Sequence, residues 1–374
     1  MWFRGRLGEM VGLHLVNLLL TLVTLGIYHF WARTRMRRYV WSHLWFDGEQ
    51  FAYTGRPREL LVGYGKALLL LVPLLLLFNL NPVYVNHPLL VALYAAISLA
   101  VYGGFIVFGG IAQFGARRYR LSRTRWRNIR FGLGGSALGF GALTLGYALL
   151  TAFSAGLYTP FMRHHLAAYQ LSRGWFGSAR VAYTGTAGPL FRLFIKVWLA
   201  AVAFIVAAPF AVGLLLATLA PGWLPVAPAL VIAAVAVAVI VAWYSYVAGE
   251  LRYLAAHARL CMPVGTDRAA GSSATGAGSP LRAPNDARAA EGLRFRLTFS
   301  GPQFAWMAVS SLALTFGTLG LAFPWVLRRK LDFACRHLDI AGRLDYDAVQ
   351  QQQDAAPAFG EGLADALDIG DLGL

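Results

Sequence analysis

The chain has 374 residues, of which 58% are hydrophobic and only 13% are charged. Soluble domains usually carry about 25% charged residues, so this composition excludes an ordinary soluble protein. The net charge of +16 could indicate nucleic-acid binding, but lysine and arginine also collect in cytoplasmic loops beside anionic lipid. We therefore expect a membrane protein whose partner is the lipid bilayer, and no nucleic-acid partner.

Residues 1–59 form the first predicted unit, with a short basic and aromatic strand, an apolar run and a hairpin. The apolar run, residues 10–32, contains several polar side chains and is followed directly by basic residues. Asp47-Gly48 lies between two aromatic runs, and this dipeptide strongly favours a two-residue hairpin turn. We expect small β-hairpins of this kind on the cytoplasmic side.

Two predicted transmembrane hairpins separate three such units. Each hairpin contains two apolar runs without Asp or Glu, long enough for the roughly 20 residues that cross a bilayer. The four runs are residues 60–80, 89–113, 190–220 and 226–249. The predicted division of the chain is unit one at 1–59, transmembrane hairpin one at 60–113, unit two at 114–189, transmembrane hairpin two at 190–260, a flexible linker at 261–292, unit three at 293–349 and a disordered acidic tail at 350–374.

The three units align as copies of one sequence. Gly26, Gly156 and Gly320 each precede an aromatic residue by five positions, and basic residues follow. The step from Gly26 to Tyr53-Thr54-Gly55 equals the step from Gly156 to Tyr183-Thr184-Gly185. We therefore predict an all-α integral membrane fold of about seven membrane segments, four plain and three weak, built from a threefold internal repeat with small cytoplasmic β-hairpins.

The distribution of charge predicts the topology. Loops 79–88 and 220–228 contain no Lys, Arg, Asp or Glu, which indicates the periplasm, whereas every other connection is basic and is expected in the cytoplasm. Each weak run therefore has positive charge on both sides. Two alternatives stay open. In the one that we favour, each weak run enters the membrane, breaks near Gly26, Gly156 or Gly320, and returns or lies along the interface; in the other, seven plain crossings break the charge rule.

Polar side chains at helical spacing mark one face of each weak run. The members are His14, Asn17, Thr21 and Thr24 in the first copy, Thr144, Tyr147, Thr151 and Ser154 in the second, and Ser311, Thr315 and Thr318 in the third. The simpler interpretation is hydrogen bonding between membrane helices. The functional interpretation is that the three stripes line a polar path near the membrane midplane, as in transporters built from repeats.

Basic clusters that follow the membrane segments are expected to form a face for lipid headgroups. Its members are Arg33, Arg35, Arg37, Arg38, Arg117, Arg118, Arg328, Arg329 and Lys330. The sequence contains no phosphate-binding loop, zinc motif or activated-nucleophile motif, so we expect no metal and no cofactor, and an enzyme is disfavoured. Cys261 and Cys335 alone are not expected to form a disulfide or a metal site.

Three stretches resemble the signature of the YjgN family of bacterial inner-membrane proteins. They are residues 17–39, 47–55 and 124–131, within a resemblance that covers roughly residues 3–347. The resemblance implies a multi-pass inner-membrane protein, and it transfers no catalytic residues because the family is of uncharacterised function. The acidic tail departs from the family pattern, and the second copy lacks a basic cluster as dense as residues 33–38.

Two functions are compatible with this sequence. The first is a transporter or channel with a polar path between the units. The second is a non-catalytic scaffold or sensor whose basic cytoplasmic face binds anionic phospholipid or a protein partner. A membrane enzyme acting on lipids has only the basic clusters in its favour, and the substrate and the oligomeric state stay open.

Overall fold

A computed structural model of the chain describes residues 1–78, 87–219, 227–262 and 292–342, with 346 and 349. The two loops expected in the periplasm, the linker and the acidic tail lie outside the described residues, apart from a few flanking positions. The fold is mostly helical, as expected, and its helices come in consecutive pairs.

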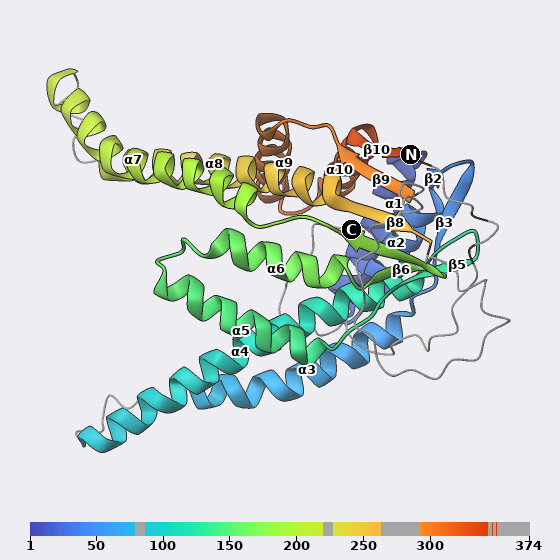
Figure 1. Cartoon of the computed structure of the whole chain (residues 1–374), viewed down its shortest axis with the longest axis horizontal. Helices are drawn as coiled ribbons and strands as arrows, with labels where there is room; N and C mark the ends of the chain where they lie inside the picture. The colour runs from blue at the N-terminus through green and yellow to red at the C-terminus, as the bar shows by residue number, and fades with distance from the viewer. Residues whose placement is uncertain (79–86, 220–226, 263–291, 343–345, 347–348, 350–374) are drawn as a thin grey trace, which may run out of the picture.

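Five helical pairs are inserted between neighbouring strands of one antiparallel sheet (Figure 1). Three pairs are short, and two are long. The short pairs are α1 (Leu7–Val23) with α2 (His29–Ser42), α5 (Ala137–Phe153) with α6 (Thr159–Leu171), and α9 (Gly301–Gly317) with α10 (Phe323–His337). The long pairs are α3 (Pro57–Phe78) with α4 (Pro88–Arg123), and α7 (Gly188–Leu219) with α8 (Ala227–His257).

The long pairs carry the predicted plain spans. Among the described residues, three segments are long and apolar enough to cross a membrane: Pro88–Arg123, Gly188–Leu214 and Val231–His257. The remaining expected span coincides with α3. At 1.5 Å per residue the 36 residues of α4 extend about 54 Å, more than the roughly 30 Å of a hydrocarbon core. If the apolar part of α4 crosses a bilayer, the end of α4 that joins the sheet therefore extends beyond the hydrocarbon core.

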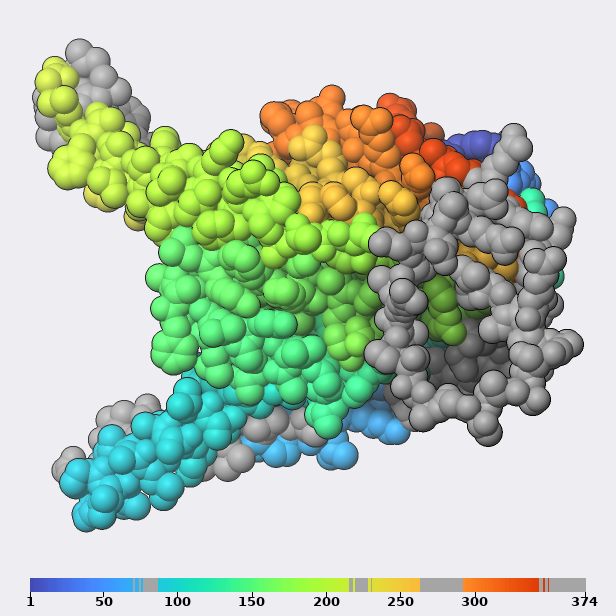
Figure 2. Space-filling model, viewed as in Figure 1, coloured from blue at the N-terminus to red at the C-terminus, as the bar shows by residue number. Residues whose placement is uncertain are grey.

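Each helical pair begins and ends at the same edge of the sheet. The strands that flank a pair are hydrogen-bonded neighbours in every case, for example β1 with β2 around α1 and α2. The chain thus leaves the sheet through one helix and returns through the next. Figure 2 shows the unit containing α5 and α6, in green, filling the space between the two projecting long pairs.

A tight left-handed turn joins the two helices of each short pair. The φ angles are 51° and 94° at Leu25 and Gly26, and 48° and 87° at Ala155 and Gly156. The third pair has 49° and 85° at Leu319 and Gly320. Glycine occupies the more strained position because it adopts a positive φ without a steric cost. This requirement explains why the three glycines align in the sequence.

Replacing Gly26 by alanine is expected to lower the free energy of unfolding by about 1–2 kcal/mol, because a Cβ is strained at this backbone conformation. Denaturant unfolding in detergent micelles measures the change. Gly12→Ala is the matched control, because Gly12 lies in the interior of α1 and a Cβ added there meets nothing within 4 Å. That exchange should be neutral or stabilising, so equal losses in the two variants would contradict the explanation.

The expectation of an all-α fold with small β-hairpins is confirmed only in part: the fold is mostly helical, but among the described residues ten short strands form a single antiparallel sheet in chain order. The strands are β1 (Trp2–Phe3), β2 (Leu44–Phe46), β3 (Glu49–Tyr53), β4 (Thr124–Trp126), β5 (Ile129–Leu133), β6 (Gly174–Phe176), β7 (Ala179–Tyr183), β8 (Ala258–Cys261), β9 (Gly292–Leu297) and β10 (Leu338–Ala341). The hairpin at Asp47-Gly48 is confirmed, with φ of 49° and 79° as a type I′ turn requires.

The sheet curves around its apolar face. Trp126 of β4 packs against Phe46 of β2 at 5.3 Å and against Phe176 of β6 at 5.8 Å between ring centroids. The same buried cluster contains Leu260 of β8 and Leu293 of β9. Strands far apart in the sheet order can share one cluster only if the sheet bends, so its concave side encloses an apolar interior.

Candidate functional site

A cavity of about 560 Å³ lies inside the curved sheet, and we call it the sheet cavity. Its walls are apolar side chains from strands on both sides of the curve. They include Phe51, Trp126, Phe131, Phe176, Leu293 and Ile340. A mostly apolar cavity of this size is typical of a site for a small molecule.

Three arginines line the sheet cavity at the end of the strands from which the helices extend. Arg37 of α2 and Arg117 and Arg120 of α4 line it there, and we call these three residues the arginine floor. Arg120 lies close enough to Arg37 and Arg117 for the three charges to interact. The described residues that line the cavity include no Asp or Glu, so the floor is a concentration of positive charge beside an apolar wall.

The floor is held by neighbouring polar groups. Arg37 is only 7% exposed and hydrogen-bonds the phenol of Tyr53, while Arg117 Nη1 donates to Gln170 Oε1 at 2.6 Å. Burial lowers the pKa of Arg37, and the Tyr53 phenol opposes that change. Burial raises the pKa of Tyr53, although the Arg37 charge works against it. A guanidinium stays charged at neutral pH even so, and the floor keeps its positive charge.

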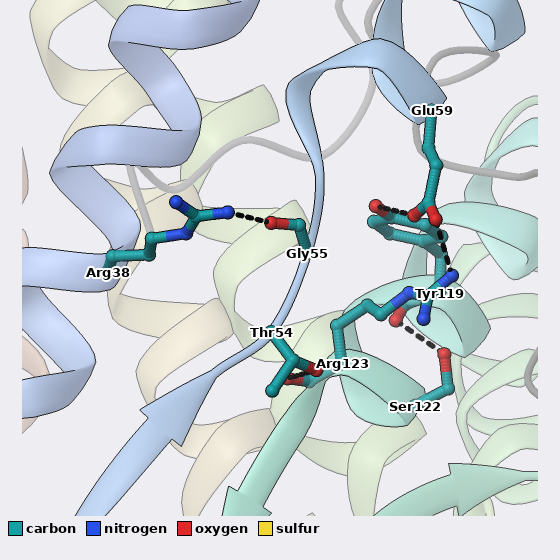
Figure 3. Close-up of polar contacts among 7 residues, drawn as sticks. All are labelled: Arg38, Thr54, Gly55, Glu59, Tyr119, Ser122 and Arg123. Carbon is teal, nitrogen blue, oxygen red and sulfur yellow. Dashed lines mark hydrogen bonds and ion pairs between the residues drawn. The ribbon is translucent and has the colours of Figure 1, made fainter.

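A second polar network fixes the end of α4 beside the floor (Figure 3). Glu59 Oε2 accepts from the Tyr119 hydroxyl at 2.6 Å, and Glu59 Oε1 accepts from Arg123 Nη2 at 2.9 Å. The Thr54 hydroxyl donates to the Arg123 carbonyl at 3.1 Å, and Arg38 Nη2 donates to the Gly55 carbonyl at 2.7 Å. These bonds join α2, α3, α4 and the end of β3, so the floor arginines project from a rigid base.

A smaller cavity of about 300 Å³ lies along the first short pair, and we call it the hairpin cavity. His14, Asn17 and Thr21 of the first predicted stripe line it together with Arg33 and Arg37. The structure therefore brings three predicted path residues together with two residues of the predicted basic face. Arg37 lines both cavities.

The other stripe residues bond within their own helical pairs. Hydroxyls at Thr24, Ser154 and Thr318 each accept from the backbone N–H four residues later, in the turn between the helices, at 2.9 to 3.0 Å. Hydroxyls at Thr21, Thr144, Thr151 and Thr315 donate to the carbonyl four residues earlier. The Tyr147 ring stacks 5.3 Å from His165, and Ser311 is buried beside Met307.

The remaining predicted basic residues are dispersed. Arg35 is exposed on α2, and Arg118 and Lys330 are half-buried. Arg328 pairs with Asp332 at 3.7 Å, and the Arg329 guanidinium lies 5.6 Å from the Trp325 ring centroid. Sequence reasoning missed Arg120, Tyr53 and Trp126 as site residues. Arg120 could have been found from its i, i+3 spacing to Arg117 on one helix face.

Comparison with known proteins identifies the family. Residues 1–264 and 283–366 match the family described as "Bacterial protein of unknown function (DUF898)". The inner membrane protein YjgN of Salmonella typhimurium is 27% identical over 130 residues, which are 35% of this chain and 30% of that protein. The chain thus matches less than a third of that relative's length, and no solved structure matches it. This chain belongs to the DUF898 family and is a bacterial membrane protein of the YjgN family, of unknown function.

Proposed function

We propose that the protein binds an anionic amphiphile, with the apolar chain in the sheet cavity and the acidic head on the arginine floor. One observation carries the proposal: an apolar cavity of about 560 Å³ ends on three arginines, with no carboxylate among its described lining residues. A bound carboxylate or phosphate is attracted by the charge of the three arginines, and this attraction is stronger beside an apolar wall than in water. Guanidinium groups suit both anions because they donate two parallel hydrogen bonds.

We propose further that the sheet lies in the cytoplasm, with the long pairs crossing the membrane and the short pairs entering it and returning. All five pairs leave the same edge of the sheet, which supports one membrane-facing side. The tips of the short pairs expose apolar residues: Leu25 is 94%, Phe153 88% and Leu319 93% exposed. Such tips are stable in hydrocarbon and unfavourable in water. The common element order of the short pairs supports a threefold internal repeat.

The turns at these tips have the hydrogen bonding that a lipid environment demands. Every backbone N–H in hydrocarbon needs an internal partner. In the first turn the N–H groups of Leu25, Gly26 and Ile27 reach carbonyls of the same turn, and that of Tyr28 reaches the Thr24 hydroxyl. The predicted polar stripe is thereby explained in part by hairpin insertion, which leaves less of it for a transport path.

The test is the choice between amphiphiles by the full-length protein in detergent micelles. We expect oleate and oleoyl lysophosphatidic acid to bind, and the uncharged oleyl alcohol to bind at least tenfold more weakly, as for a loss of about 1.4 kcal/mol. Native mass spectrometry counts the bound molecules. Equal binding of the acid and the alcohol would refute an anion site at the arginine floor.

A polar transport path is the second candidate, favoured by the position of His14, Asn17 and Thr21 along one cavity. It predicts that cysteines replacing Thr21, Thr151 and Thr315 all react with a water-soluble thiol reagent. The experiment needs a background in which Cys261 and Cys335, both free thiols, are replaced by serine. Protection of Thr151→Cys and Thr315→Cys would exclude a path shared by the three stripes.

A further inference from the structure

The hairpin cavity differs from the sheet cavity in its chemistry. Its polar lining comes from both helices of the first short pair, and Phe323 at the start of α10 closes one side. The His14 ring packs 5.5 Å from the Phe323 ring, which ties the first pair to the third. The cavity therefore lies between the first and the third short pair.

Asn17 carries an unused acceptor in this cavity. The side chain is only 4% exposed, and its Nδ2 donates to the Ala32 carbonyl at 3.3 Å. Its Oδ1 has no hydrogen-bond partner among the described residues. A buried acceptor left unsatisfied is destabilising, so a ligand that donates a hydrogen bond is stabilised there.

Thr21 strengthens the same preference for a donor. The Thr21 hydroxyl donates its proton to the backbone carbonyl of Asn17 at 2.7 Å, so for a ligand in the cavity the Thr21 Oγ1 atom can act only as an acceptor. Asn17 and Thr21 lie four residues apart on one face of α1. Two residues of α1 that line the cavity thus carry acceptor oxygens.

Positive charge lies on the opposite helix. Arg33 and Arg37 are four residues apart on α2 and both line the cavity, with His29 one turn before Arg33. The two helices therefore offer acceptors on one side and cations on the other. This pattern matches a group that carries a phosphate and a hydrogen-bond donor together.

We infer that the hairpin cavity binds a phospholipid headgroup in which a phosphodiester is joined to a hydrogen-bond donor. Arg33 and Arg37 hold the phosphate, and Asn17 Oδ1 accepts from the ammonium or hydroxyl group. The inference rests on the inserted hairpins proposed above, which bring the cavity to the lipid. It deepens that proposal by adding a second lipid site that shares Arg37 with the first.

Two probes that differ only in donor groups test the inference. Lysophosphatidylethanolamine has N–H donors, whereas lysophosphatidylcholine has methyl groups in their place. Native mass spectrometry of the full-length protein in detergent is expected to show at least a fivefold preference for the ethanolamine form. The donor groups of lysophosphatidylglycerol are hydroxyls, so its binding shows whether a hydroxyl can replace the ammonium group as the donor. Equal binding of the ethanolamine and choline forms would overturn the inference.

Asn17→Leu supplies the variant, since leucine has the same branching of its side-chain heavy atoms and cannot accept a hydrogen bond. The preference for the ethanolamine form should fall to about one, while Asn17→Asp should retain or increase it. Oleate binding measures the sheet cavity separately and should be unchanged in Asn17→Leu. If the unmodified protein bound oleate no better than oleyl alcohol, the proposed function alone would be refuted. If Asn17→Leu kept the preference for the ethanolamine form, this second site alone would be refuted.

Discussion

Arg120→Gln is expected to weaken oleate binding to the sheet cavity at least tenfold. A hydrogen bond to a charged group contributes about 1.5–3 kcal/mol, and the loss of 1.4 kcal/mol is a factor of ten. Glutamine keeps much of the side-chain length but removes the charge. Arg37→Gln should act in the same direction, because Arg37 is also part of the floor.

The matched control is Arg35→Gln on the same helix as Arg37. Arg35 is exposed, so the exchange makes the same change in net charge without touching the cavity. Its effect on oleate binding should stay below a factor of two, because an exposed charge acts weakly across water and salt. If Arg35→Gln and Arg120→Gln weakened binding equally, the effect would be a long-range one and the floor would have no special role.

A variant of the cavity wall separates anion binding from chain binding. Leu293 is buried and lines the sheet cavity, and phenylalanine there would reduce the free volume. We expect the unmodified protein to bind oleate better than the shorter laurate, and Leu293→Phe to bind laurate better than oleate. Overpacking costs about 1–3 kcal/mol of stability, so unfolding is measured in parallel. An unchanged order of the two acids would indicate that the chain lies elsewhere.

Local signals in the sequence predicted the local structure well. The hairpin at Asp47-Gly48 and the breaks at Gly26, Gly156 and Gly320 are each determined by the conformation of one or two residues. The sheet could not be predicted in the same way. Most of its strands have two to five residues, too few for a period-two pattern, and most partners are separated by a helical pair.

The sheet cavity was hidden for the same reason. Arg37, Tyr53 and Arg120 come from three different elements, and only the pairing of β3 with β4 brings them together. Membrane-edge arginines usually reflect topology, so the sequence suggested a flat basic face. The structure instead distributes these residues between the floor of a cavity, exposed positions and ion pairs. Position beside the cavity, which the sequence does not display, separates the site residues from their neighbours.

Arg163→Gln is expected to lower the free energy of unfolding by about 3–5 kcal/mol. Arg163 Nε of α6 lies 2.7 Å from Glu250 Oε2 of α8, and the arginine also lies 5.3 Å from the centroid of the Trp243 ring. The Glu250 side chain is only 4% exposed. Removing its partner leaves a buried carboxylate uncompensated, which costs far more than the ion pair itself contributes.

The double variant Arg163→Gln, Glu250→Gln should recover most of that loss, because two neutral amides carry no buried charge. Asp332→Asn is the control, since it removes a partner of Arg328 from a more exposed pair and should cost less than about 1 kcal/mol. A loss in Arg163→Gln no larger than in Asp332→Asn would contradict the argument. The recovery matters for architecture, because this ion pair joins α6 of a short helical pair to α8 of a long one. If the double variant recovers the lost free energy of unfolding, then apolar packing holds α6 and α8 together. The charges in that case mainly determine which residue pairs with Glu250.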